Sequence, residues 1–180
     1  MGERFTSFDD AWRQFLERQE PLEDFFVSEL GGGEAHVDLW LVIPPAAVKL
    51  AALKLQAELE RFDWLTLVPH DYLHVSLAAP VGPAELTYAR VNCFHSAVVV
   101  EVASDELHEY DRSPTFLPHL TLAVTSRAAP ADELRAVLGP LRETFLGRQR
   151  VEESIRVSFP FSRERLFEPW TVHERVPVGR

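Results

Sequence analysis

The sequence predicts an α+β fold built on a largely antiparallel sheet. Some segments repeat their apolar residues with the 3.6-residue period of a helix, and others alternate apolar and polar residues as strands do. These segments do not follow one another in the regular strand–helix–strand order of a parallel α/β protein. A length of 180 residues with 46% apolar residues is typical of one soluble domain whose core needs no disulfides.

An acidic helical extension is predicted over residues 1–33. Ser7 has the side chain of a helix N-cap, and aromatic and aliphatic residues follow it at helical spacing. Pro21 is expected to end or kink this helix, and residues 22–30 are expected to resume as a second turn or a short helix. The run Gly31–Gly33 then separates the extension from the main domain. A lid, a dimer contact and an inert extension all remain open as its role.

The main domain over 34–180 mixes strands and helices. Pro44 ends its first strand and Pro69 a later one, because proline breaks both helices and sheet ladders. The segment 80–92 is rich in proline and glycine and is expected to hold a short helix. Strands are predicted over 37–43, 64–68, 73–78, 94–102, 119–124, 155–161 and 170–176, and helices over 46–62 and 131–145, with a helical turn over 104–110.

Composition excludes several classes of protein. The net charge of −10 argues against binding double-stranded nucleic acid, which requires a basic surface. Cys93 is the single cysteine, so no internal disulfide and no cysteine-based metal site can form, and a reducing cytoplasm is expected. Residues 1–10 lack the apolar core of a secretory signal, and no apolar run is long enough to span a membrane.

The charge is unevenly distributed along the chain. Residues 1–118 carry a net charge of −12, whereas residues 119–180 carry +2. A general polyanion-binding surface is therefore not expected, but a local anion pocket supplied by the C-terminal part is.

Two segments share the order histidine, apolar, hydroxyl, apolar. They are His74-Val75-Ser76-Leu77 and His119-Leu120-Thr121-Leu122. Residues i and i+2 of a strand share a face, so each segment presents an imidazole beside a hydroxyl while its apolar residues enter the core.

Two such strands facing one cleft supply the groups needed for displacement at a phosphodiester. A neutral histidine takes a proton from the nucleophile, and a protonated one donates to the leaving oxygen. The hydroxyls of Ser76 and Thr121 donate hydrogen bonds to the non-bridging oxygens. His74 and His119 are therefore the predicted acid–base pair, in an order the sequence does not fix, with no metal or cofactor expected.

These segments resemble the signature of the two-histidine (2H) phosphoesterase superfamily. Its bacterial members are the 2′-5′ RNA ligase-like proteins, or RNA 2′,3′-cyclic phosphodiesterases. The resemblance rests on Leu67 to Leu77 and on Leu117 to Ala123, each containing one His-x-[Ser/Thr]-x segment. The strand ending at Pro44 and the closing segment at Trp170 also match, so the resemblance covers roughly residues 36–178.

The resemblance implies a bilobal, pseudo-symmetric domain with antiparallel sheets lining a central cleft and helices outside. It implies a metal-independent enzyme that opens a 2′,3′-cyclic phosphate on an RNA end or small nucleotide, or acts at 2′,5′ linkages. It assigns acid–base roles to His74 and His119 and phosphate binding to Ser76 and Thr121. The oligomeric state stays open, with a monomer expected.

The sequence departs from the family where many relatives carry a basic residue just after each motif. Ala78 and Val124 occupy those places here. The pocket is therefore expected to be less cationic and to favour a small monoanion. Arg127 and Arg156 are the predicted substitutes for the missing charges.

Trp40 is the third predicted substrate-binding residue. It shares one face of its predicted strand with His36 and Asp38. If that face lines the cleft, the indole stacks on a nucleobase. A tryptophan that covers the sheet, beside a solvated His36–Asp38 pair, is the alternative.

Three other interpretations remain open. His74 and His119 can be structural histidines bonded to backbone, or the same pocket can bind a nucleotide or RNA end without turnover. The third is a zinc site, because His70 and His74 have the spacing of a helical His-x-x-x-His pair. Pro69 and the alternation that follows it favour a loop and then a strand.

Several further residues have a weaker functional signal. Cys93 is expected in the core, and His173 near the cleft without a catalytic role. Arginines near the C-terminus form either a basic rim or a salt-bridged surface with Glu152, Glu153 and Glu164. These arginines are Arg148, Arg150, Arg163 and Arg165.

Overall fold

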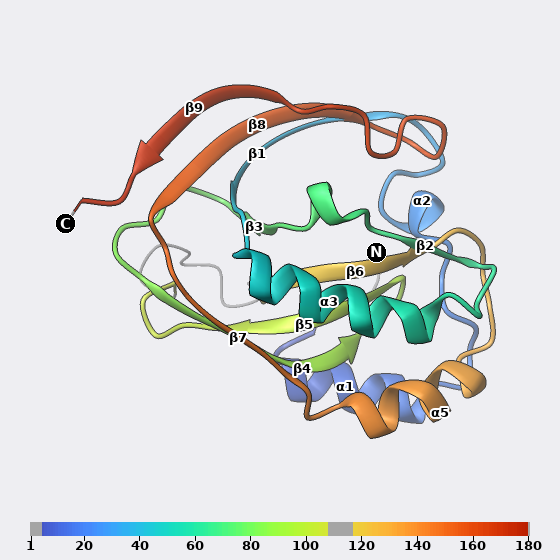
Figure 1. Cartoon of the computed structure of the whole chain (residues 1–180). Helices are drawn as coiled ribbons and strands as arrows, with labels where there is room; N and C mark the ends of the chain where they lie inside the picture. Colours follow the sequence, from blue (N-terminus) through green and yellow to red (C-terminus); the bar gives the residue numbers. More distant parts are fainter. Residues whose placement is uncertain (1–4, 108–116, 180) are drawn as a thin grey trace.

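One open antiparallel sheet organises the chain (Figure 1). The computed structural model describes residues 5–107 and 117–179. Within them the strands are β1 (Ala35–Val42), β2 (Leu65–Leu67), β3 (Val75–Leu77), β4 (Glu85–Cys93), β5 (Ala97–Ala103), β6 (His119–Thr125), β7 (Phe145–Arg150), β8 (Glu153–Phe161) and β9 (Thr171–Pro177). The hydrogen-bonded order is β7-β4-β5-β6-β3-β1-β8-β9, and β2 also pairs with β6. The predicted α+β class with an antiparallel sheet is confirmed.

The sheet divides into two halves of four strands. We call β7-β4-β5-β6 the β6 half and β3-β1-β8-β9 the β3 half. The halves join where β3 and β6 pair antiparallel, with Val75 opposite Leu120. Each motif strand is thus the innermost strand of its half. The two expected lobes are two halves of one continuous sheet.

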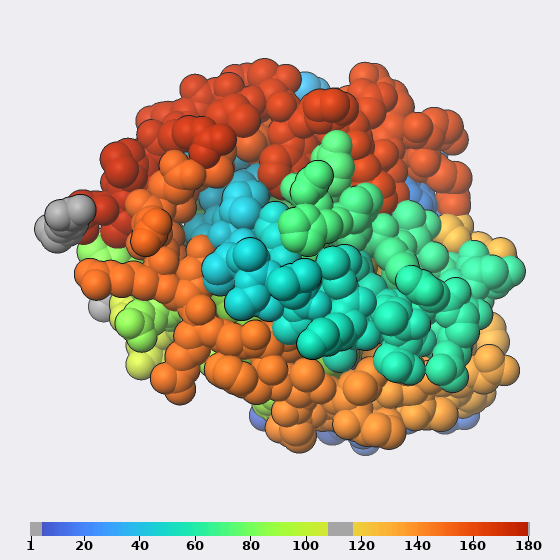
Figure 2. All heavy atoms as spheres, viewed as in Figure 1, coloured from blue at the N-terminus to red at the C-terminus, as the bar shows by residue number. Residues whose placement is uncertain are grey.

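The described helices are α1 (Phe8–Glu17), α2 (Phe25–Ser28), α3 (Ala46–Leu59) and α5 (Asp132–Leu141), with a 3-10 turn η1 (His70–Tyr72). Figure 1 shows α3 across the front of the sheet, with α1 and α5 together below it. Figure 2 shows the outer face of α3 on the molecular surface, above α5. The side chain of Gln56 fixes α3 in place, since its Nε2 donates to the carbonyls of Val68 and Leu122, at 2.7 Å each.

Alternation within the motif strands determines which side chains enter the core. Val75 and Leu120 are fully buried, as are Leu73 and Leu122. These residues pack in the main core with the buried face of α3. Burying apolar side chains on one face directs the intervening polar side chains to the opposite face.

The N-terminal segment packs against the β6 half. The Ser7 side chain caps α1 by accepting from the Asp10 amide at 3.0 Å. Asn92 of β4 donates to the Phe8 carbonyl at 2.8 Å, and Leu22 forms a bridge with Ala129. The segment therefore shares its packing with the sheet, while the division into residues 1–33 and 34–180 stays a prediction.

The structure corrects two element predictions. The short helix expected within 80–92 is wrong, because β4 occupies residues 85–93. A bulge at Arg90, whose φ is 66°, interrupts the alternation that marks a strand. The helix expected over 131–145 ends at Leu141, and β7 begins at Phe145. Of the turn expected over 104–110, residues 108–110 lie outside the described part of the chain.

Candidate active site

A cavity of about 400 Å³ lies against the inner face of the sheet, where the two halves meet. His74, Ser76, His119 and Thr121 all line it. The prediction that the two motifs face one cleft is therefore confirmed in position. The hydroxyl and imidazole of each motif share this face because the apolar residues between and beside them are buried in the core.

The strand register interleaves the two motifs. Because Val75 lies opposite Leu120 in an antiparallel pair, His74 lies opposite Thr121 and Ser76 lies opposite His119. Each imidazole therefore has the hydroxyl of the other motif across the strand. The imidazoles occupy diagonal positions of the ladder, for which the typical spacing is about 7–8 Å.

Both imidazoles are oriented by the same kind of hydrogen bond. Nδ1 of His74 lies 2.6 Å from the Tyr72 carbonyl, and Nδ1 of His119 lies 2.7 Å from the Leu117 carbonyl. A carbonyl only accepts, so Nδ1 carries the proton in each neutral ring. Nε2 is then the nitrogen that exchanges protons.

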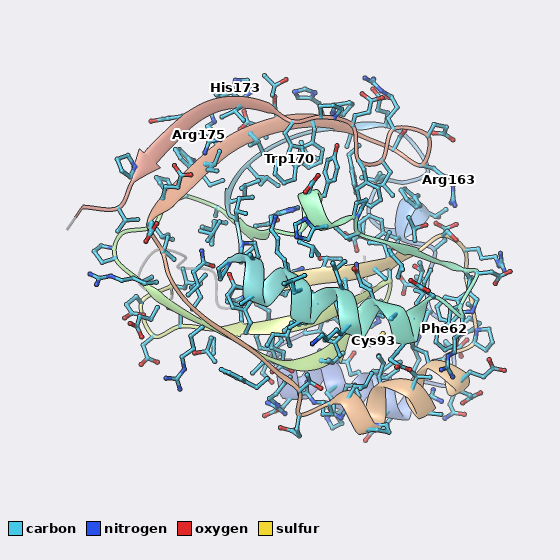
Figure 3. The ribbon with its side chains drawn as sticks, in the orientation of Figure 1. Phe62, Cys93, Arg163, Trp170, His173 and Arg175 are labelled. Carbon is cyan, nitrogen blue, oxygen red and sulfur yellow. The ribbon has the colours of Figure 1, made fainter. Side chains whose placement is uncertain are left out.

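An aromatic ring packs edge-on against each imidazole. Trp170 contacts His74 with ring centroids 5.3 Å apart, and Phe94 contacts His119 at 5.0 Å. Figure 3 shows Trp170 beneath β8, on the inner side of the sheet's curve. These contacts hold the rings in place.

Burial lowers the pKa of both histidines. The charged imidazolium loses its hydration in the apolar cavity, and this loss outweighs the opposing effect of the carbonyl that each Nδ1 contacts. The pKa of His74 is lowered further by the positive charges of His119 and Lys49. Both rings therefore favour the neutral form before a ligand binds.

Lys49 distinguishes the two histidines. It lies on the buried side of α3, where only 9% of its surface is exposed. Burial lowers its pKa, and the negative charge of Asp71 opposes this. No comparable cation acts on the pKa of His119. The two imidazoles thus have the same geometry and different electrostatic surroundings.

Solved structures share this architecture. Escherichia coli LigT in its apo form superposes with a TM-score of 0.56 at 16% sequence identity, covering 82% of this chain and all of LigT. TT0787 of Thermus thermophilus gives 0.55 at 16% identity, covering 78% of this chain and 97% of that protein. No family model matches the sequence, and the curated proteins give no match.

The chain has the fold of LigT. LigT and TT0787 belong to the 2H phosphoesterase superfamily that the two motifs resemble. Crystal structures of LigT contain 3′-AMP, ATP, NADP+ or phosphate.

The position predicted for Trp40 in this LigT-like fold is wrong. In the β1–β3 ladder Leu41 lies opposite Ser76, on the cavity face, and Trp40 lies opposite Leu77, on the core face. Trp40 accordingly packs against the main core, whereas Val37 and Leu39 line the cavity. Both faces of this strand carry apolar residues, and only the register with β3 determines which one faces the cavity.

The two predicted compensating arginines also lie outside the cavity. Arg156 is the ladder partner of Trp40 and therefore points to the same opposite face, where it forms a two-point contact with Asp38 at 2.9 Å. Arg127 follows β6 and pairs with Asp63 at 2.7 Å. Both guanidiniums are bonded to carboxylates at the surface, so the predicted phosphate contacts are not formed there.

The sequence did not identify most of the cavity wall. Its aromatic residues come from the N-terminal segment, η1, the β4–β5 turn, β8 and the segment before β9, and no short motif connects these parts of the sequence. His95 and Ser96 of the β4–β5 turn also line the cavity. The alternating aromatic residues of β8 were the one local pattern in the sequence that could have indicated this wall. The described aromatic residues of the wall are Phe5, Phe25, Tyr72, Phe94, Phe159, Phe161, Phe167 and Trp170.

The zinc alternative lacks its helix. His70 begins a single 3-10 turn and contacts Asp71 at 3.0 Å, and His74 follows that turn in extended chain. The prediction of a loop and then a strand is confirmed. Among residues 5–107 and 117–179, no three His, Cys, Asp or Glu side chains are grouped to hold a metal ion.

The remaining candidate residues make contacts that support the fold. Cys93 is buried, as expected, and burial raises the pKa of its thiol. His173 lies on the outer side of the sheet and contacts Ser158 at 2.6 Å (Figure 3). Arg163 and Arg165 form salt bridges, but with carboxylates other than the predicted Glu152, Glu153 and Glu164.

Proposed function

We propose that this chain is a metal-independent phosphodiesterase that opens the 2′,3′-cyclic phosphate of a nucleotide or RNA end, or acts at 2′,5′ linkages. The observation that carries the proposal is the interleaved register, which sets two imidazoles and two hydroxyls around one cavity. The LigT fold supports it, because structures of LigT contain nucleotides and phosphate.

The proposed reaction uses two proton transfers. One neutral imidazole takes a proton from water through Nε2, and the water oxygen attacks phosphorus. The bond between phosphorus and one ribose oxygen breaks, and the second imidazole, protonated, donates its Nε2 proton to that oxygen. The product is a phosphomonoester beside a free ribose hydroxyl, and each imidazole has exchanged one proton.

We assign the base to His74 and the acid to His119. The cation of Lys49 favours the neutral form of His74, which is the form a base requires. His119 has no such neighbour among the groups that act on its pKa. The anionic phosphate, once bound between the rings, raises the pKa of both histidines and allows His119 to hold its proton.

The two hydroxyls stabilise the phosphoryl oxygens in this mechanism. Ser76 and Thr121 lie on the same face as the imidazoles, one across the strand from each. Their O–H groups are placed to donate to the non-bridging oxygens, whose charge must be stabilised during transfer. The surrounding aromatic wall strengthens these hydrogen bonds by excluding water.

A direct test follows adenosine 2′,3′-cyclic monophosphate by phosphorus NMR in the presence of EDTA. The proposal expects one or both adenosine monophosphates to appear, and His119→Asn to stop their formation. Substrate that stays intact while calorimetry detects binding contradicts the enzyme and favours a nucleotide-binding module. That second function draws support from a cavity wall that has no Lys or Arg among its described residues.

Location and assembly belong to the same proposal. No helix in the described part of the chain is long and apolar enough to cross a membrane. A cytoplasmic location, a monomeric state and a nucleotide or RNA end as the partner remain proposals.

A further inference from the structure

The charge of the cavity wall is unusual for a site that binds phosphate. Apart from its histidines, the ionisable side chains among the described wall residues are the phenol of Tyr72 and the carboxylate of Glu29. Glu29 follows α2 at the exposed rim and forms no ion pair with any described residue. The fixed charge at this rim is therefore negative.

The arginines closest to the wall in sequence or contact are already paired with carboxylates. Arg18, which contacts His95 of the wall, lies 3.5 Å from Glu23. Arg165 precedes Leu166 of the wall and binds Glu168 at 2.9 Å. Arg163, near α2, binds Asp24 at 2.6 Å. A phosphate beyond the one held by the imidazoles would have to compete with these carboxylates.

Most of the remaining wall is apolar, and part of it comes from the two ends of the chain. Phe5 and Phe25 belong to the acidic N-terminal segment, whereas Phe159 and Phe161 belong to β8. Phe25 packs edge-on against Phe161 with ring centroids 5.7 Å apart. The N-terminal segment thus completes the cavity, and it brings Glu29 to the rim together with Phe25.

A cavity of about 400 Å³ is at the small end for ligand sites. One cyclic phosphate between the imidazoles and one nucleoside against the rings suit this volume and its apolar wall. A second phosphate would lie among the rings, where burying an unpaired charge is unfavourable, or beside Glu29, where like charges repel.

We infer that, given the proposed function, the N-terminal segment makes this site selective for cyclic phosphodiesters with a single negative charge, and that Glu29 is a specificity-determining residue. The substrate class is a nucleoside 2′,3′-cyclic phosphate without a 5′-phosphate. The 3′ end of a longer RNA, which places a phosphodiester at the same 5′ position, is a poor substrate.

The test compares two substrates that differ only in the second phosphate. They are adenosine 2′,3′-cyclic monophosphate and the same nucleotide carrying a 5′-phosphate. The wild-type chain is expected to prefer the former in kcat/KM by about tenfold or more at low salt, with the preference shrinking as salt rises. Glu29→Gln is expected to raise kcat/KM for the 5′-phosphorylated substrate about threefold to tenfold and to raise it less for the substrate with a single negative charge, so that the preference shrinks.

Glu20→Gln is the matched control, because Glu20 is an exposed acid of the same segment outside the described wall. It is expected to leave the preference unchanged. Equal kcat/KM values for the two substrates in the wild type overturn the inference while the proposed function stands. A preference equally strong in Glu29→Gln overturns the role of Glu29.

Failure of the proposed function is a separate result. If neither substrate is hydrolysed, the phosphodiesterase proposal fails, and the same selectivity is then measured as the ratio of the two Kd values by calorimetry. Tighter binding of the nucleotide without the 5′-phosphate supports the charge selectivity, and equal Kd values overturn it.

Discussion

His74 immediately precedes a strand of three residues, whereas His119 begins a strand of seven. Both rings nevertheless have Nδ1 at the carbonyl two residues before, a hydroxyl two residues after, and an aromatic edge against the ring. The geometry of the site thus repeats on both sides of the β3–β6 junction. The electrostatics do not repeat, since Lys49 acts on the pKa of His74 and not on that of His119.

The two halves show that the sequence determines the orientation of the imidazoles and their electrostatic surroundings in different ways. The four-residue motif is sufficient to orient an imidazole and a hydroxyl, whatever the length of the strand around it. An element outside the two motifs then makes the surroundings of the two imidazoles different, here α3, which carries Lys49. Equal orientation in different electrostatic surroundings suits a pair of acid and base.

The largest expected effect comes from removing either Nε2. His74→Asn and His119→Asn keep an N–H that can reach the carbonyl of Tyr72 or Leu117, but they remove the proton-transferring nitrogen. Each variant is expected to lose about 10²–10⁴-fold in kcat, since each acid–base group contributes on that scale. The rates are measured by phosphorus NMR, with circular dichroism as the folding control. A folded variant of either half that keeps a near-wild-type rate would show that the halves do not act as a pair.

Removing a hydroxyl is expected to have a smaller effect. Thr121→Val preserves the shape of the side chain and removes its O–H, so kcat is expected to fall about 10–100-fold with little change in KM. Ser76→Ala makes the equivalent change in the other half. Similar losses in kcat for the two variants indicate that both hydroxyls contribute equally to binding the phosphate. A loss confined to one variant shows that only the hydroxyl of that half binds it.

The difference between the halves is tested directly at Lys49. Lys49→Met removes a cation near His74, so the pKa of His74 rises. The acid limb of the pH profile of kcat/KM, which reports the base, is expected to move to higher pH. Lys54→Met, on the exposed side of the same helix, is the control. Movement of the alkaline limb instead would reverse the assignment of acid and base.

The lowered pKa values also make folding stability depend on pH. The unfolded chain protonates its histidines near pH 6.5, whereas folded His74 and His119 resist protonation until lower pH. Their contribution is therefore complete above about pH 6.5 and is lost as the pH falls from there toward the folded pKa values. Urea unfolding from about pH 7.5 to about pH 5 is expected to show a steeper loss of stability in the wild type than in the His74→Asn/His119→Asn double variant. Equal slopes would contradict the burial of the two rings as neutral groups.

The smallest expected effect is at the opposite face of the sheet. Arg156 and its partner Asp38 lie away from the cavity, so Arg156→Gln is expected to leave kcat/KM within about twofold of the wild type. Steady-state kinetics with the cyclic nucleotide measure this. A loss of tenfold or more would restore Arg156 as a substrate-binding residue.

The sequence predicted the motif residues because their placement depends on local alternation. Val75 and Leu120 are apolar and enter the core, which directs the neighbouring imidazoles and hydroxyls to the cavity. Trp40 could not be placed in the same way, because Leu41 and Trp40 are both apolar and either face of β1 suits a core. The partner strand determined the outcome by setting Leu41 opposite Ser76.

The cavity wall depended on contacts that no local pattern encodes. Phe25 meets Phe161 from near the opposite end of the chain, and nothing in either segment indicates the other. The strand β4 was missed for a related reason, because the bulge at Arg90 shifts the alternation within it. Long-range pairing and local irregularity together account for most of what the sequence left open.

The junction at Val75 and Leu120 has a consequence for the direction of the chemistry. A half-turn about this residue pair exchanges the two imidazoles and the two hydroxyls. By microscopic reversibility, the ring that protonates a departing oxygen in one direction deprotonates an incoming oxygen in the other. If this site performs phosphodiester exchange, ring opening and ester synthesis therefore require the same four side chains, and the supply of water and alcohol decides which reaction prevails.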